Sequence, residues 1–222
     1  MADAEGKKQA RALNALIDAC LLAPGEHPPR ELAIRLPAED VTALAERVRR
    51  RATLIARRER LHAEAILTAR DALILALYAS ATPRGAFTAW SDGSSRQGQA
   101  AGIGGLLMDP EGRMVAHLSQ PRQGLDAFAA EVAALEAVMR AAADRGAGRL
   151  RVYTDCVALL LLWLEKRADP RLEQVRKQAH RFRRFELRAL PRLHNQPANR
   201  LARQALASAL LARLSILGNQ RP

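Results

Sequence analysis

A change of hydrophobic pattern near Pro83 is the feature that most constrains the fold. Residues 1–80 repeat apolar side chains at three- and four-residue steps, as amphipathic helices do. Residues 86–216 instead alternate short runs typical of strands with longer helical stretches. Between them, Pro83 disfavours helix at the preceding residue, and Gly85 adds a joint. We therefore expect an α-helical extension over 1–80 and a separate α/β domain over 86–216.

The extension should fold as a helical hairpin. One helix is expected over 4–23 and, after a proline-rich loop over 24–38, a long basic helix should run unbroken from 39 to 80. Its segment 47–60 carries seven arginines. These arginines either form a solvated face, partly paired with glutamates at helical spacing, or form a second surface that binds nucleic acid. A third use is a homodimer through these N-terminal helices, because the later half of the long helix is apolar on nearly all sides.

The second domain alternates strands and helices in an order that predicts its topology. Three strands in a meander, a crossover helix and a parallel strand indicate a mixed five-stranded sheet with flanking helices and a site at strand ends. The expected strands span 86–91, 101–108, 113–119, 149–154 and 185–191, and the expected helices span 126–144, 156–166, 170–183 and 197–216.

Three acidic residues stand at informative places in this pattern. Asp92 follows the first strand and opens a turn, Glu131 lies in the crossover helix, and Asp155 follows the fourth strand. Singly, they read as a hairpin turn, a solvated helix charge and a helix N-cap. Together, on adjacent strands with the helix between them, the carboxylates can meet. Three carboxylates so close together repel one another unless protons or cations lie between them, and Mg²⁺ prefers oxygen ligands of this kind.

The residues around these acids resemble the type 1 ribonuclease H family. That family has an Asp-Gly-Ser/Ala turn, an Ala-Glu-x-x-Ala-Leu helix segment, a Tyr/Thr-Asp step and an Asn-x-x-Ala-Asp-x-Leu-Ala segment. The resemblance covers residues 86 to about 205, and Asn199 stands where the family has a fourth acid. The matching segments are Asp92-Gly93-Ser94, Ala130-Glu131-Val132-Ala133-Ala134-Leu135, Tyr153-Thr154-Asp155 and Asn195-Gln196-Pro197-Ala198-Asn199-Arg200-Leu201-Ala202.

The resemblance implies an endoribonuclease that hydrolyses the RNA strand of RNA–DNA hybrids with two Mg²⁺ ions, or Mn²⁺ in their place. It implies that Asp92 bridges the ions, and that Glu131, Asp155 and Asn199 complete their coordination. Because the Asn199 amide offers an oxygen but no charge, we expect a slower or more metal-demanding enzyme.

Further residues are candidates for contact with the substrate. The resemblance points to the backbone at Gly93, Ser94 and Ser95, and to Asn195. His194 lies in the loop where some members have a mobile histidine, so it is either a proton shuttle or a polar loop residue.

Composition narrows the partners. The net charge is +12 and the sequence pI is about 11.1, which favours nucleic acid, although an Ala-, Leu- and Arg-rich bias alone gives the same charge. Two cysteines, Cys20 and Cys156, suggest a reducing compartment. The N-terminus lacks an apolar signal core, and no stretch is long and apolar enough to span a membrane. We therefore expect a cytoplasmic protein with no membrane partner.

Two other functions fit the same residues. One is a catalytically weak or inactive ribonuclease H-like protein that binds nucleic acid or acts in assembly, with the helical extension as its interaction element. The other retains nuclease chemistry but acts on structured RNA or branched DNA, because this fold hosts several polynucleotide reactions.

Overall fold

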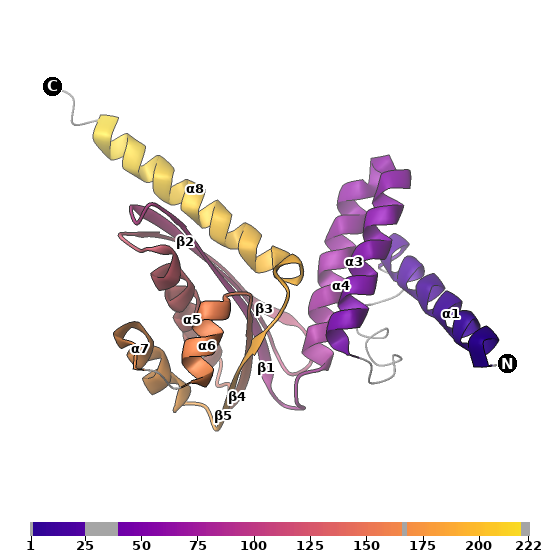
Figure 1. The fold of residues 1–222 in the computed structure, drawn as a ribbon. Coiled ribbons are helices and arrows are strands. Elements are labelled where there is room, and N and C mark those ends of the chain that lie inside the picture. Colours follow the sequence, from indigo (N-terminus) through magenta and orange to yellow (C-terminus); the bar gives the residue numbers. More distant parts are fainter. Residues whose placement is uncertain (1, 25–39, 166–167, 219–222) are drawn as a thin grey trace. The chain divides into compact units, whose positions relative to one another are not determined.

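A computed structural model describes residues 2–24, 40–165 and 168–218, and the proline-rich loop expected over 24–38 lies almost wholly outside them. The chain divides into two compact units, Met1–Ala81 and Thr82–Pro222 (Figure 1). Within the described parts, no helix has both the length and the apolarity needed to cross a membrane.

The first unit is a set of packed helices. α3 and α4 lie against each other, and α1 packs against both. An ion pair between Asp18 and Arg51 links α1 to α3. The elements are α1 (Ala2–Leu22), α3 (Val41–Arg58), the short 3-10 helix η1 (Arg60–His62) and α4 (Ala63–Ser80).

The unbroken helix expected over 39–80 is wrong. Glu59 leaves the helical conformation, with φ −95° and ψ 61°, and the chain reverses through η1. No glycine or proline marks this break in the sequence. The reversal buries Val48 and Ile55 of α3 and Ile66 and Leu73 of α4. In one straight helix, the apolar side chains of α3 could not pack against those of α4, and both sets would be exposed.

The second unit is built on a five-stranded sheet with the strand order β3-β2-β1-β4-β5. The first three strands form an antiparallel meander, and β4 and β5 run parallel to β1. The mixed sheet expected from the sequence is therefore confirmed. The strands are β1 (Phe87–Arg96), β2 (Ala100–Met108), β3 (Met114–Gln123), β4 (Arg149–Thr154) and β5 (Arg184–Ala189).

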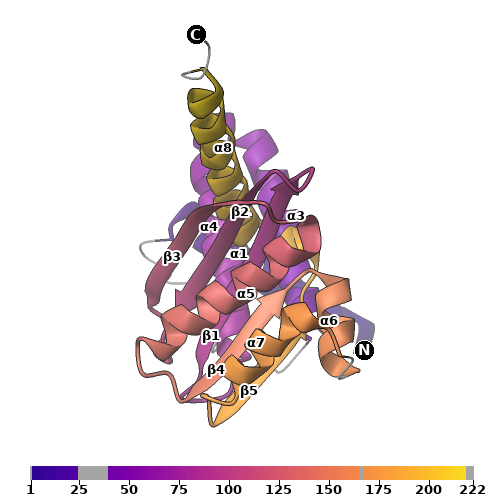
Figure 2. The same cartoon turned by 90° about the vertical axis from the view of Figure 1, so that its left-hand side faces the viewer.

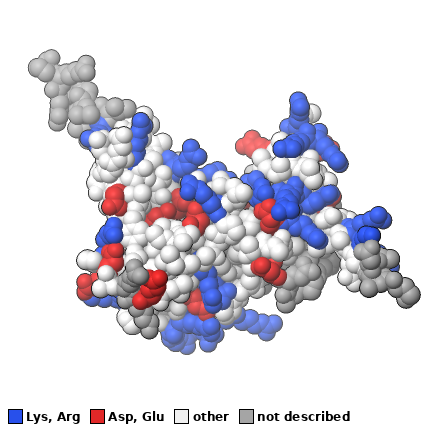
Figure 3. Space-filling view, in the orientation of Figure 1, with Lys and Arg blue, Asp and Glu red and all other residues white. Residues whose placement is uncertain are grey.

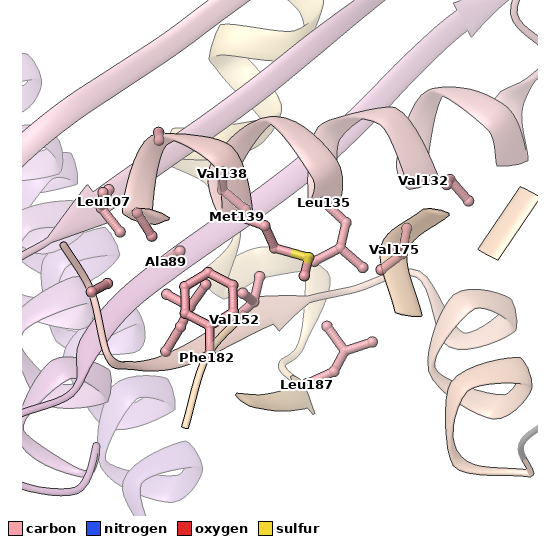
Figure 4. Close-up of a cluster of buried hydrophobic side chains, with 14 of the residues drawn as sticks. Ala89, Leu107, Val132, Leu135, Val138, Met139, Val152, Val175, Phe182 and Leu187 are labelled. Carbon is pink, nitrogen blue, oxygen red and sulfur yellow. The ribbon is translucent and has the colours of Figure 1, made fainter. Parts of the chain in front are cut away.

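Helices cover both faces of this sheet (Figures 1 and 2). α8 packs on β1, β2 and β3, and α5 packs on β1 and β2 from the opposite face. The main apolar core lies on the α5 side, where Leu135, Val138 and Met139 meet Val152 and Phe182 (Figure 4). The helices are α5 (Ala127–Ala143), α6 (Val157–Leu164), α7 (Pro170–Ala179), η2 (Arg192–His194) and α8 (Gln196–Gly218).

Two glycines let α8 lie directly on β2. A Cβ at Gly102 would lie 2.0 Å from the Ala202 carbonyl oxygen, and a Cβ at Gly104 would lie 2.1 Å from that of Ala198. Both distances are far below van der Waals contact, so only glycine permits this approach. Gly104 is also the β2 partner of Asp92. The close packing therefore brings the first turn of α8 next to Asp92.

The turn expected at Asp92–Ser95 is wrong, because β1 continues to Arg96 and stays paired with β2 along that length. The reversal comes at Gln97 and Gly98, whose φ angles are 52° and 67°. The Gln99 N–H donates to the Arg96 carbonyl at 3.0 Å. Two consecutive residues with positive φ are typical of the tight turns that join twisted antiparallel strands.

Candidate active site

Asp92 lies where β1 extends past its parallel neighbour. Pairing between β1 and β4 ends at Trp90 and Tyr153, so Asp92 and the segment that follows β4 share one end of the sheet. Asp92 is buried, with 2 % of its surface exposed. The Asn199 side-chain amide donates to both of its carboxylate oxygens, at 3.3 and 3.2 Å. A neutral donor from α8 thus partly satisfies a buried carboxylate.

Glu131 reaches the same end of the sheet from α5. Asp126 caps the start of this helix by accepting a hydrogen bond from the Ala129 N–H at 2.7 Å. About one turn further along, Glu131 Oε2 accepts a hydrogen bond from the Gly93 N–H at 3.0 Å. A Cβ at Gly93 would lie 2.3 Å from the backbone of α5. The glycine that the sequence suggested for a turn instead allows the helix to approach the strand.

Asp155 directly follows β4 and is held by Asn195. The buried Asn195 amide donates to Asp155 Oδ1 and also to the Ser91 carbonyl, the latter at 3.0 Å. Asn195 therefore joins the ends of β1 and β4 across the site. These contacts place it as a support for Asp155, and its contact with substrate stays a prediction.

Burial and mutual repulsion raise the pKa of two of the carboxyl groups. The pKa of Asp92 rises to about 6, first through burial and then through the charge of Asp155, while the hydrogen bond from Asn199 opposes the rise. The pKa of Glu131 rises to about 8, through burial and then the charge of Asp92, against the hydrogen bond from Gly93. The site therefore disfavours ionisation of both Asp92 and Glu131 when no cation is bound.

Sequence comparison decides the family, because residues 90–205 match the model of the reverse transcriptase-like family. The chain belongs to this family. The matched span contains Asp92, Glu131, Asp155 and Asn199, and the resemblance to the type 1 ribonuclease H family is confirmed. A search of curated proteins gave no match.

Several solved structures similar to this reverse transcriptase-like chain are ribonucleases H. RNase H1 from the archaeon Halobacterium salinarum NRC-1 is 28% identical with a TM-score of 0.52, over 56% of this chain and 100% of its own. The N-terminal RNase H domain of a Mycobacterium tuberculosis protein is 26% identical with a TM-score of 0.52, over 57% and 97%. LC11-RNase H1 in complex with RNA/DNA hybrid is 20% identical with a TM-score of 0.51, over 56% and 99%, and supports the fold alone.

The donor chemistry of this reverse transcriptase-like site fits Mg²⁺. Carboxylate oxygens are its preferred ligands, and one or two carboxylates suffice where substrate phosphates complete the shell. The raised pKa values of Asp92 and Glu131 mean that their charged forms are destabilised in the folded protein, and a bound cation would offset that destabilisation. Among the described residues, however, no three acidic, His or Cys side chains already surround a single metal position. Glu131 is turned to the Gly93 N–H, so the acids form an open group rather than a closed cage.

The other predicted substrate and shuttle residues have distinct positions. Gly93, Ser94 and Ser95 are half-buried on β1 beyond Asp92, and the Ser95 hydroxyl donates to the Leu125 carbonyl at 2.6 Å. His194 closes η2 and is 1% exposed, so in this conformation it does not face solvent. Its role as a proton shuttle stays a prediction.

Sequence reasoning missed two contributors to this site. One is Arg192, an exposed residue three positions before Asn195. Its positive charge opposes the rise in the pKa of both Asp92 and Glu131. No motif distinguishes it from the other arginines. Gly104 was detectable, because a strand containing Gly102, Gly104 and Gly105 signals a close approach of backbone.

Proposed function

We propose that this chain is an RNase H-type endoribonuclease that hydrolyses the RNA strand of RNA–DNA hybrids. The observation that carries the proposal is the convergence of Asp92, Glu131 and Asp155, from β1, α5 and the end of β4, at one end of the sheet. Membership of the reverse transcriptase-like family supports the same reaction class. LC11-RNase H1 has been solved in complex with RNA/DNA hybrid, so in that protein this fold accommodates such a duplex.

The reaction we propose depends on two divalent ions, Mg²⁺ or Mn²⁺, and on how the chain holds its acids. When bound, the ions supply an activated water and stabilise the leaving oxygen of the phosphodiester. Asp92 and Asp155 are the acids that face each other, and both would hold metal. Asn195 keeps Asp155 turned toward the site, and Glu131 would join them by exchanging the Gly93 N–H for a metal.

Asn199 distinguishes this site from one with four acids. Its amide N–H groups point at Asp92, so it would have to present its oxygen instead in order to bind a metal. The site then carries one negative charge fewer, and its attraction for divalent cations is weaker. We therefore propose a higher Mg²⁺ requirement than a four-acid site would have.

Cleavage of a labelled RNA–DNA hybrid tests the proposal, with duplex RNA, duplex DNA and single-stranded RNA alongside, in Mg²⁺ and in Mn²⁺. We expect hybrid-specific cutting that Asp92→Asn and Asp155→Asn each abolish. Glu173→Gln is the matched control, because Glu173 is an exposed acid on α7 paired with Lys177, and it should cut at the wild-type rate. Cutting that survives both site substitutions would contradict the assignment.

A second candidate function is hybrid binding without efficient cleavage. The two hydrogen bonds from Asn199 to Asp92 favour it, because they satisfy a carboxylate that would otherwise need a cation. Tight hybrid binding without cutting in either metal would select this alternative. Dimerisation through the N-terminal helices and a cytoplasmic location stay predictions.

A further inference from the structure

The solvent-facing side of α3 is basic along its length. Arg50, Arg57 and Arg58 are exposed, and Arg47 is half-exposed on the same side. Arg60 follows in η1 and is exposed as well. In Figure 3, basic side chains predominate at the upper end of the helical unit. We call these five residues the arginine face.

Most of the arginine face has no acidic partner among the residues that the structure describes. Arg50 is paired with Glu46 at 2.8 Å, and Arg49 and Arg51 beside the face are paired with Glu46 and Asp18. In contrast, no carboxylate of the described residues pairs with Arg47, Arg57, Arg58 or Arg60. Cations gathered on one side without acidic partners create a positive potential that attracts anions.

The opposite side of α3 is already used for packing. Leu44, Val48, Ala52 and Ile55 are buried there, where α3 packs against α4 and α1. A basic amphipathic helix binds a membrane surface by inserting its apolar side between lipids. That side is not available here, so the arginine face fits a polyanion that approaches from solvent.

The first unit also lacks exposed Phe, Trp or Tyr side chains on which single-stranded bases could stack. Its only Phe, Trp or Tyr is Tyr78, which is 1% exposed. Binding of single-stranded nucleic acid relies on aromatic side chains that stack on the bases. Arginines spaced at 47, 50, 57 and 58 extend over about 16 Å of helix at 1.5 Å per residue. A row of that length matches several phosphates of one duplex strand, which are spaced about 3.4 Å apart along the axis.

We propose that the arginine face binds the phosphate backbone of double-stranded nucleic acid, independently of its sequence. This gives the chain a second duplex-binding surface in a unit separate from the acidic site. The binding does not depend on the proposed cleavage, because no residue of the arginine face belongs to the second unit. Each arginine that contacts a phosphate would make the plot of log affinity against log salt concentration steeper by about 0.9.

Binding of the full chain to a labelled RNA–DNA hybrid tests this proposal. The measurement is fluorescence anisotropy in EDTA over a range of salt concentrations, so that cleavage plays no part. The test variant carries Arg57→Gln, Arg58→Gln and Arg60→Gln. We expect its salt slope to decrease by about 3 and, as a result, its affinity at about 0.1 M salt to fall by about a hundredfold or more.

The control variant removes the same charge from cations that the chain already pairs. Arg113→Gln, Arg171→Gln and Lys177→Gln replace partners of Asp109, Asp169 and Glu173, and should leave the affinity within about twofold of wild type. The triple variant Arg57→Lys, Arg58→Lys and Arg60→Lys keeps the charge and should bind as wild type, which separates the effect of charge from that of folding. Circular dichroism checks that each variant retains its helices.

Three results would overturn the proposal. The first is a Gln variant whose affinity and salt slope equal those of the control. The second is an equal loss of affinity for a single strand of the same sequence, since the surface would then not be specific for duplex. The third is loss of binding to vesicles of anionic lipid with hybrid binding intact, which would assign the arginine face to a membrane surface. Because cleavage is not measured, an inactive enzyme would leave all three outcomes readable.

Discussion

Asn199 and Asp92 lie 107 residues apart in the chain, yet the Asn199 amide donates to both oxygens of the Asp92 carboxylate. The contact exists because β2 presents glycine to α8, and Asp92 sits opposite one of these glycines, Gly104. A hydrogen bond to a carboxylate favours its charged form, and here it opposes the rise in the pKa of Asp92 that burial causes. Asn199 therefore stabilises the acid in the metal-free protein.

Replacing Asn199 with Asp should exchange this stabilisation for metal affinity. In EDTA, the Asn199→Asp protein should lose about 2 kcal/mol of unfolding free energy, because a donated hydrogen bond becomes a repulsion between carboxylates. The Mg²⁺ concentration for half-maximal cleavage should fall. Chemical denaturation in EDTA and a Mg²⁺ titration of hybrid cleavage measure the two effects.

Asn14→Asp on α1 makes the same chemical change away from the site and should change neither the unfolding free energy nor the Mg²⁺ requirement. Identical Mg²⁺ curves for wild type and Asn199→Asp would exclude Asn199 from metal binding.

Asn195 should act by positioning Asp155. Asn195→Ala leaves the Ser91 carbonyl without its donor and frees Asp155 to turn. We expect kcat to fall by about 10–100-fold with little change in KM, and the Mg²⁺ requirement to rise. Steady-state kinetics at several Mg²⁺ concentrations test this. Gln196→Ala is the control, because the Gln196 side-chain amide donates to the Arg192 carbonyl at 3.4 Å and, within the described parts of the chain, to no acid of the site. A change confined to stability, with kcat and metal requirement intact, would show that Asn195 is merely structural.

Much of the second unit was predictable because its signals are local. The periods of 2 and 3.6 residues located all five strands and the main helices close to their observed positions. The motifs also indicated that Asp92, Glu131, Asp155 and Asn199 would come together. Which donor faces which acid was not predictable. Asn195 meets Ser91 across 104 residues of sequence, and such a pairing depends on the register of the sheet and the docking of α8.

Two local predictions failed for identifiable physical reasons. The pair Asp92-Gly93 predicts a turn, but glycine also serves where backbones approach closely, and that second use applies at Gly93. The break at Glu59 has no Gly or Pro, because tertiary packing of α3 on α4 decides it rather than local propensity. Both failures concern residues whose conformation is set by partners distant in sequence.

Glu131→Gln should stabilise the metal-free protein at high pH while abolishing cleavage. The pKa of Glu131 is raised to about 8 in the folded protein, so the folded state prefers the protonated form. Between the unfolded pKa of about 4.3 and the folded value, rising pH therefore costs stability. Thermal unfolding in EDTA should show the variant melting above wild type at pH 9, with the difference vanishing near pH 4. The exposed Glu173→Gln control should not gain stability with pH. A difference that is independent of pH would mean that Glu131 is not a buried charge.

Gly104→Ala should separate α8 from the sheet and disturb the site from behind. The added Cβ would lie 2.1 Å from the Ala198 carbonyl oxygen and 2.4 Å from the Ala202 nitrogen. Both atoms belong to backbone, so the helix itself must move, at a cost of about 1–3 kcal/mol. Because Asn199 lies between Ala198 and Ala202, the shift should also weaken its contact with Asp92 and alter the Mg²⁺ requirement.

Gly6→Ala is the control, because nothing lies within 4 Å of the added Cβ in α1. It should stabilise the protein slightly, through higher helix propensity. Gly104→Ala with wild-type stability and metal requirement would show that the packing of α8 on β2 does not position Asn199.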